Sequence, residues 1–382
     1  MTITDIRYHL TTELGSPALF VVIDTDAGIT GYGEATIHFF PQAVAGMLDD
    51  LRPYLIGEDP RRIEHLWQAC FRTLFMRGGP VTGAAIAGID MALWDIKGKA
   101  LDVPVYELLG GLARTKVRLY GHVTGDTAEE MAANARERAS RGITAIRFRG
   151  FHAYDREEVH DHQMAVDQQV EFTAAIREAV GDGIDILIEC HGRFDPLLGG
   201  KIGKLIAPYN PGWFEEPVRS TQTQNMAALN ATLGIPVAGG ESLAGIDAFL
   251  TFLSARAAQI IQPDPVTCGG ISEIKKICAI AQAHHIQVAP HNAQGPVCTA
   301  ACLHVDASTP NILIQEVFED FATPFAAKIT DYPTEIVDGH VVIPDRPGLG
   351  LDLDEAAMAQ YPYDESHFLD MFGAGGWEKR NL

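Results

Sequence analysis

Six polar residues that could do chemistry recur along the middle of the chain at an almost constant interval. They are Glu189, Glu215, Glu241, Asp264, His291 and Glu316, separated by 26, 26, 23, 27 and 25 residues. Each follows or closes a short apolar run, such as IDILIEC or IPVAGGE. A strand, a helix and two short loops take about that many residues, because parallel strands need a crossover of about a dozen or more. The spacing therefore predicts consecutive strand–helix units with an acid or a histidine at each strand's carboxyl end, where a (β/α) barrel carries its active site.

The three glutamates would repel one another at one barrel mouth unless a cation lay among them. Carboxylate oxygens are hard ligands that suit Mg²⁺ or Mn²⁺ better than zinc or copper, and three of them leave coordination positions open for water and substrate. The alternative is that Glu189, Glu215 and Glu241 form salt bridges with lysine or arginine between strands. Because all three fall at the ends of consecutive predicted strands, we favour a Mg²⁺ site.

Two histidines accompany this predicted metal site. His191 follows Glu189 by two residues, so both side chains share one face of a strand, although a lone histidine is often only a core or surface residue. Asp264 and His291 end neighbouring strands, and a carboxylate beside an imidazole raises its basicity, which makes the pair a candidate general base. Glu316 ends the next strand and could hydrogen-bond where negative charge develops. This set favours removal of a proton α to a carboxylate, with His191 protonating a leaving hydroxyl.

We call the six regularly spaced residues, Glu189 to Glu316, the ladder. The regions before and after it have different sequence patterns. Residues 1–113 begin with alternating strands and continue with helical patterns that end at Gly110 and Gly111, which predicts an α+β domain. Residues 114–325 are predicted to form the barrel, an α/β catalytic domain. Residues 326–382 contain short strands and Gly/Pro turns and are predicted to return to the first domain.

Composition narrows the classes of function. A chain of 382 residues with 47% apolar residues has room for about two domains and a large core. The formal net charge of −21 argues against nucleic acid or an anionic membrane as a partner, whereas a bound dication can still invert the local field for an acidic substrate. The six cysteines lack CxxC spacing, and neither a secretory signal nor an 18-residue apolar run is present, so we expect a cytoplasmic protein.

With these motifs the chain resembles the enolase superfamily, in its mandelate racemase-like branch, over essentially its whole length. The stretches that carry the likeness are GITGYGEAT, MRGGPVTGAAIAGIDMALWDIKGKALDVPVYELLGG, IECHGRFD, WFEEPV, GESL, IIQPDPVTCGGISEIKKICAIA, APHNAQGP and IQEVFED. The resemblance implies a modified TIM barrel, (β/α)7β, under an N-terminal α+β capping domain. It also implies one Mg²⁺ held by Glu189, Glu215 and Glu241, and a homo-oligomer.

Within that branch the chain is similar to acid-sugar dehydratases of the galactonate, gluconate and mannonate type. ECHGR and PHNAQGP resemble the galactonate and gluconate pattern, which implies that His191 is the acid and that His291, with Asp264, is the base. AIRFRG and YGHV resemble mannonate dehydratases. By that likeness, His38, His122 and Arg147 would face the substrate. Glu316, from its place in the ladder, is also expected to bind it.

Three departures from the family pattern bear on the chemistry. Glu189 stands where the family usually has Asp, and its extra methylene could shift the metal or the substrate. Asp264 is present where typical mannonate dehydratases lack that acid. Arg147-x-Arg149 stands where the family often has Lys-x-Lys, and arginine does not deprotonate in proteins, so Arg147 is not a base. Either Arg147 activates Tyr154 as a base, or Arg147 and Arg149 bind substrate or pair with the ladder.

The number of bases distinguishes the reactions. Racemisation needs a base on each face of the substrate, whereas dehydration needs one base and one acid. With one His–Asp base and His191, we expect a Mg²⁺-dependent dehydratase that converts a sugar acid into a 2-keto-3-deoxy acid. Two alternatives stay open: an epimerase or racemase of a related hydroxy acid, and a catalytically idle relative that binds a sugar acid.

Overall fold

The N-terminal region pairs a small antiparallel sheet with helices. The computed structural model describes residues 1–13, 16–150, 161–318, 322–332 and 334–364. The sheet has the order β1-β2-β3, and its glycines let a helix pack closely, since a Cβ on Gly33 would lie 1.8 Å from the carbonyl oxygen of Gly88. The elements are β1 (Ile3–Glu13), β2 (Ser16–Thr25), β3 (Thr30–Glu34), α1 (Pro41–Leu51), η1 (Arg52–Tyr54), α2 (Ile63–Thr73), α3 (Pro80–Leu101) and α4 (Val105–Leu108).

Parallel strands follow and close into a barrel. They are β4 (Lys116–Val123), β5 (Ala145–Arg149), β6 (Asp185–Glu189), β7 (Trp213–Glu215), β8 (Val237–Gly239), β9 (Ile260–Ile261), β10 (Gln287–Val288) and β11 (Gln315–Glu316). From β4 to β10, each strand pairs with the strand that follows it in the chain. β11 pairs with β4. A parallel bridge from Val288 to Ile312, just before β11, completes the ring.

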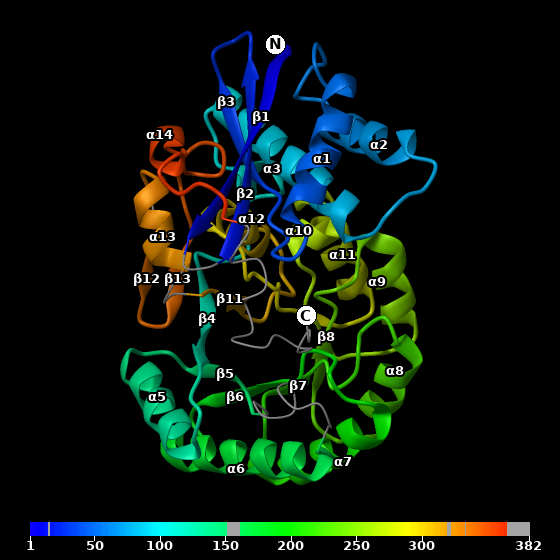
Figure 1. Cartoon of the computed structure of the whole chain (residues 1–382), viewed down its shortest axis with the longest axis vertical. Helices are drawn as coiled ribbons and strands as arrows, with labels where there is room; N and C mark the ends of the chain where they lie inside the picture. The colour runs from blue at the N-terminus through cyan, green and yellow to red at the C-terminus, as the bar shows by residue number, and fades with distance from the viewer. Residues whose placement is uncertain (14–15, 151–160, 319–321, 333, 365–382) are drawn as a thin grey trace.

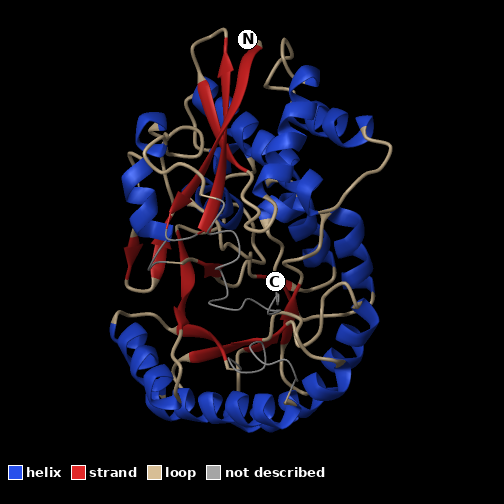
Figure 2. Ribbon diagram, in the orientation of Figure 1, coloured by secondary structure: helices blue, strands red, loops and turns tan. Residues whose placement is uncertain are grey.

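Helices cover the outside of the barrel, and the N-terminal sheet lies at one end of the molecule (Figures 1 and 2). The helices are α5 (Ala128–Ser140), α6 (His162–Val180), α7 (Pro196–Ile206), η2 (Ala207–Tyr209), α8 (Thr223–Thr232), α9 (Gly245–Ser254), α10 (Pro265–Cys268), α11 (Ile271–Ala283) and α12 (Pro296–Ala307). The predicted (β/α)7β barrel with an α+β capping domain is thus confirmed. None of the helices in the described ranges is both long and apolar enough to cross a membrane.

Alternation along the strands sorts the inside of the barrel into an apolar and a polar layer. One buried cluster contains Tyr120, Ala145, Leu187, Trp213, Ala238, Ile260, Ala289 and Ile314. Side chains two residues apart on a strand share a face, so the next position on each strand also points inward. Those next positions are His122, Arg147, Glu189, Glu215, Gly240, Gln262, His291 and Glu316. Apart from Gly240, which has no side chain, these positions form a polar layer next to the apolar layer inside the barrel.

The C-terminal segment contacts both the barrel and the capping region. Its elements are α13 (Ala322–Ile329), β12 (Ile336–Val337), β13 (His340–Val342) and α14 (Glu355–Met358), and β13 pairs antiparallel with β4. Leu349 donates its backbone N–H to Asp95 of α3 at 2.8 Å, and Arg7 of β1 forms an ion pair with Glu355. The domain limits at residues 113 and 325 stay a prediction.

Candidate active site

Three glutamate carboxylates meet at the carboxyl-terminal mouth of the barrel. Glu189 and Glu215 end β6 and β7, and Glu241 lies in the loop after β8. One oxygen from each side chain lies within 4.8 Å of the other two. Burial and the neighbouring Glu189 raise the pKa of Glu215 well above its ordinary value, and burial is the main cause that raises the pKa of Glu241 to about 8. Arg147 offsets part of this charge through its ion pair with Glu189, at 2.8 Å, but Glu215 and Glu241 still need a further cation to be ionised together with it. Hard oxygen donors fit Mg²⁺.

On one side of this carboxylate cluster lies His291, paired with Asp264. The Nδ1 of His291 lies 2.6 Å from Oδ2 of Asp264, which leaves Nε2 at 3.4 Å from Oε2 of Glu241. Asp264 also accepts hydrogen bonds from the side chain of Gln294, at 2.7 Å, and from the backbone N–H of Thr267, at 2.9 Å. Burial works against a charged imidazole here, but Glu241, then Glu316 and Asp264, raise the pKa of His291 well above its ordinary value. His291 is thus a fixed, strongly basic imidazole whose Nε2 faces the cluster.

On the other side lies His191, beside Arg147. Nη2 of Arg147 donates to Oε2 of Glu189 at 2.8 Å and lies 3.0 Å from Nε2 of His191. A guanidinium N–H is a donor, so Nε2 of His191 accepts and its proton lies on Nδ1. Burial, together with the positive charges of Arg147 and Arg149, outweighs Glu189 and lowers the pKa of His191 to about 3. Pairing with the ladder, one of the roles that the sequence left open for Arg147, is therefore present.

Further predicted residues are linked to the same mouth. Nε2 of His122 donates to Oε1 of Glu316 at 2.8 Å, and its ring stacks on Phe318 with 3.7 Å between centroids. The other carboxylate oxygen of Glu316 accepts the backbone N–H of Asn292 at 2.9 Å. Burial lowers the pKa of His122. Glu316 is thereby held between strand β4 and the loop that carries His291.

His38 brings the capping region into contact with the barrel mouth. It follows β3, and its Nε2 donates to the carbonyl oxygen of Ala293 at 3.1 Å, two residues after His291. Burial lowers the pKa of His38, and the charges of His291 and Asp264 also act on it. Tyr154, the other candidate base, lies outside the described residues.

Sequence reasoning missed two residues at this site. The indole N–H of Trp213 donates to Oε2 of Glu215 at 2.7 Å and so holds one of the cluster oxygens. Gln262 points inward from the end of β9 and is 1% exposed, yet neither atom of its amide has a hydrogen-bond partner among the described residues. Both residues lie two positions before a ladder acid, so the strand alternation that predicts inward-facing side chains could have found them.

Comparison with known proteins gives consistent matches. Residues 3–110 match the family described as mandelate racemase/muconate lactonizing enzyme, N-terminal domain, and residues 130–357 match the enolase C-terminal domain-like family. A D-galactonate dehydratase of Ralstonia pickettii is 40% identical over 347 residues, which cover 90% of each chain.

Two solved structures resemble the chain along nearly its whole length. A mandelate racemase/muconate lactonizing enzyme from Sulfitobacter sp superposes with a TM-score of 0.89 at 35% identity, covering 95% of this chain and 96% of that one. An enolase from Pantoea ananatis with bound D-gluconate and Mg superposes with a TM-score of 0.88 at 29% identity, covering 95% of each chain.

Proposed function

Because the chain belongs to the mandelate racemase/muconate lactonizing enzyme family of the enolase superfamily, we propose that it is a Mg²⁺-dependent dehydratase of a sugar acid. One observation carries the proposal. Three carboxylate oxygens lie within 4.8 Å of one another, with the His291–Asp264 pair on one side and His191 on the other. Mg²⁺ would be held by Glu189, Glu215 and Glu241 and, when bound, would offset the negative charge that develops on the substrate carboxylate.

His291 acts as the general base in this proposal. Its Nδ1–H is held by Asp264, so Nε2 is the atom that takes the proton α to the substrate carboxylate. Asp264 stabilises the imidazolium that results, and its remaining hydrogen bonds, to Gln294 and Thr267, keep it oriented for that task. Glu316, held by His122 and the Asn292 N–H, stays ionised, because the charge of His291 and these donors keep its pKa low.

His191 acts as the general acid once substrate is bound. In the free protein, burial and then the charge of Arg147 lower the pKa of His191 and so disfavour a charged imidazole at this position. A substrate anion in contact with Arg147 would offset the guanidinium charge, which raises the pKa of His191 and lets it carry a proton. His191 then delivers that proton to the departing β-hydroxyl. The balance is one α-proton and one hydroxide lost as water, and the enol product becomes the 2-keto-3-deoxy acid.

The epimerase alternative requires a base opposite His291. On that side lie Arg147, the inward side chain of β5, which cannot give up its proton at ordinary pH, and His191, to which the proposal gives the role of acid. The asymmetry of the site therefore favours dehydration. The cytoplasmic location and the homo-oligomeric state stay predictions.

A panel of aldonic and aldaric acids tests the proposal. D-galactonate and D-gluconate come first, since the names of two similar proteins mention them. With Mg²⁺ present, an α-keto acid should accumulate, measured as its semicarbazone, and chelation of the metal should stop the reaction. Exchange of the α-proton with solvent deuterium without loss of hydroxyl would instead favour the epimerase. Absence of both reactions with every acid would contradict the proposal and favour the idle, sugar-acid-binding relative.

A further inference from the structure

A buried glutamate of the capping region reaches across to the barrel loop that carries His291. Glu34 is the last residue of β3 and is 0% exposed. Its Oε1 accepts the backbone N–H of Gly295 at 2.6 Å, and its Oε2 accepts the backbone N–H of Cys298 at 2.9 Å. The hydroxyl of Thr36 donates to Oε1 at 2.8 Å. The carboxylate thus bridges two parts of the chain that are more than 250 residues apart in sequence.

The loop that Glu34 fastens contacts most of the proposed catalytic groups. We call residues 291–295 the base loop. Within it, His291 and Gln294 both contact Asp264, and Asn292 contacts Glu316. Gly295 ends the base loop against the carboxylate itself, because a Cβ there would lie 2.9 Å from Oε1 of Glu34.

Glu34 also begins the capping segment that faces the base loop. Four residues after it, His38 donates to the carbonyl oxygen of Ala293 in the base loop. Glu34 accepts a hydrogen bond from Gly295, at the end of the base loop, and another from Cys298, in the first turn of α12 just beyond it. His38 donates one to Ala293, so the base loop is fixed to the same short stretch of the capping region. The orientation of His291 depends on the backbone that carries it, and that backbone is held at its far end by a group outside the barrel.

We propose that Glu34 is a positioning residue that locks the base loop, and with it the Nε2 of His291, to the capping region. The inference rests on the proposed function for its catalytic consequence, but its structural content stands on these contacts alone. Glu34 lies away from the reacting atoms and acts through Gly295 and Cys298. Its loss should lower kcat much more than it raises KM, because the base is misaligned while the carboxylate cluster remains.

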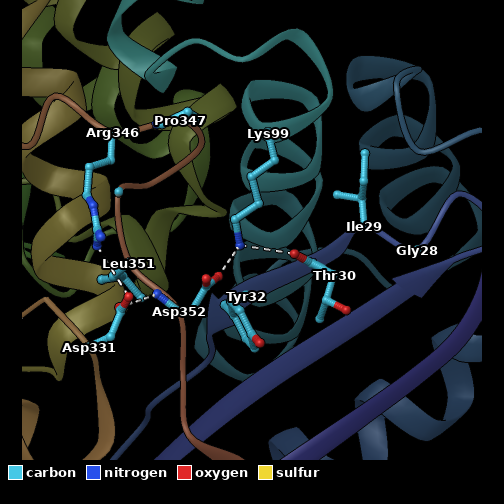
Figure 3. Close-up of a pocket in the computed structure, with 11 residues that line it drawn as sticks. Gly28, Ile29, Thr30, Tyr32, Lys99, Asp331, Arg346, Pro347, Leu351 and Asp352 are labelled. Carbon is cyan, nitrogen blue, oxygen red and sulfur yellow. Dashed lines mark hydrogen bonds and ion pairs between the residues drawn. The ribbon is translucent and has the colours of Figure 1, made fainter.

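The chain offers a matched control in Asp95 of α3. Asp95 is also 0% exposed and also accepts two backbone N–H groups, from Tyr32 at 3.0 Å and from Leu349 at 2.8 Å. It joins the capping region to the C-terminal segment instead of the base loop. Unlike Glu34, Asp95 also forms an ion pair with Lys99, at 2.8 Å. Lys99 has two further partners, Asp352 at 2.6 Å and the carbonyl oxygen of Thr30 at 3.0 Å, as Figure 3 shows.

The surroundings of this control lie apart from the proposed active site. Lys99 and Tyr32 line a cavity of about 540 Å³, and the residues that line it include none of the ladder residues. The cations at this cavity are paired, Lys99 with Asp352 and Arg346 with Asp331 at 3.3 Å (Figure 3). Asp95→Asn should therefore weaken a buried contact between a carboxylate and two backbone N–H groups, together with the ion pair to Lys99, without touching the catalytic machinery.

The test compares Glu34→Gln, Glu34→Asp and Asp95→Asn in the full chain by hydrogen–deuterium exchange and by steady-state kinetics. Glutamine offers one acceptor oxygen, and its NH₂ would face an N–H donor, so residues 291–299 should exchange faster in Glu34→Gln. The kcat of this variant should fall by about tenfold to a hundredfold with KM changed by no more than about threefold. Glu34→Asp, which keeps the charge, should recover part of the loss and takes the place of Glu34→Gln if that variant does not fold.

Asp95→Asn should speed exchange only around residues 346–353 and leave kcat within about twofold of wild type. Unchanged exchange at residues 291–299 in the Glu34 variants, or an equal fall of kcat in Glu34→Gln and Asp95→Asn, would overturn the inference while leaving the proposed function intact. If wild type dehydrates no sugar acid, the proposed function fails, and the exchange data alone then decide whether Glu34 holds the base loop.

Discussion

The two sides of the carboxylate cluster shift the pKa of a histidine in opposite directions. His291 faces carboxylates, with Asp264 at 2.6 Å and Glu241 at 3.4 Å, and its pKa is raised. His191 faces a guanidinium, with Nη2 of Arg147 at 3.0 Å, and burial together with this charge lowers its pKa to about 3. One histidine is therefore prepared to take up a proton and the other waits for an anion to offset Arg147. With the proposed roles, this difference suits elimination, which uses one base and one acid, better than proton exchange on both faces of the substrate, which uses two bases.

The largest expected effect comes from replacing Glu215, a carboxylate of the cluster between the two histidines. Glu215→Gln should lower the affinity for Mg²⁺ at least about a hundredfold, because it removes a direct ligand, whereas outer-shell partners already cost about tenfold to a hundredfold. Activity should fall to background. Isothermal titration with Mg²⁺ measures the affinity. The matched control is Glu216→Gln, since Glu216 instead accepts hydrogen bonds from Ser220 and Gly240; equal losses in both variants would contradict the assignment of Glu215.

The second prediction concerns His291, the proposed base. His291→Asn should lose both dehydration and exchange of the α-proton with solvent deuterium, by about 10²- to 10⁴-fold, because both begin with proton removal. Its Mg²⁺ affinity should stay close to that of wild type. Proton NMR in D₂O follows both reactions at once. Exchange that persists in this variant would show that another group removes the proton.

The third prediction concerns His191, the proposed acid, and differs from the one for His291. His191→Asn should lose dehydration by about 10²-fold or more, while exchange of the α-proton continues, because His291 and Asp264 are untouched. The same NMR assay in D₂O measures both. Equal loss of exchange and dehydration would mean that the two histidines do not have separate roles.

The smallest expected effect is a shift in the pH dependence of kcat/KM, which tests whether Asp264 raises the pKa of His291. The base must be unprotonated to act, so the raised pKa of His291 places the acid limb of kcat/KM at higher pH than for a free imidazole. Asp264→Asn removes one of the carboxylates that raise this pKa, so the limb should move to lower pH by about one unit. A pH profile of kcat/KM measures the shift. A limb that stays in place or moves to higher pH would show that Asp264 does not set the basicity of His291.

The barrel, and the place of several ladder residues at its strand ends, could be predicted because the six residues recur at the length of one strand–helix unit. Glu189, Glu215 and Glu316 are the last residues of β6, β7 and β11, as the spacing indicates. Strand ends alone do not account for Glu241 and Asp264, which lie in loops after the short strands β8 and β9, because loops have no period that fixes their direction.

Contacts that depend on side-chain reach were beyond the sequence pattern. Arg147 lies on β5 beside β6, but its length allows it to reach Glu189 and His191 or to point elsewhere, and only its packing decides. The partners of Glu34 could not be predicted from the sequence. Gly295 and Cys298 donate to it through backbone N–H groups, which every residue except proline has. Gln262 was missed because a neutral amide does not stand out among ladder acids.

A crystal structure of His291→Asn with Mg²⁺ and a sugar acid that the wild type dehydrates would test the central claim most directly. We predict one ion at about 2.0–2.1 Å from oxygens of Glu189, Glu215 and Glu241, with the substrate's α-carbon on the side of residue 291 and its departing hydroxyl on the side of His191. An ion bound elsewhere, or a substrate with both reacting groups on one side of the cluster, would contradict it.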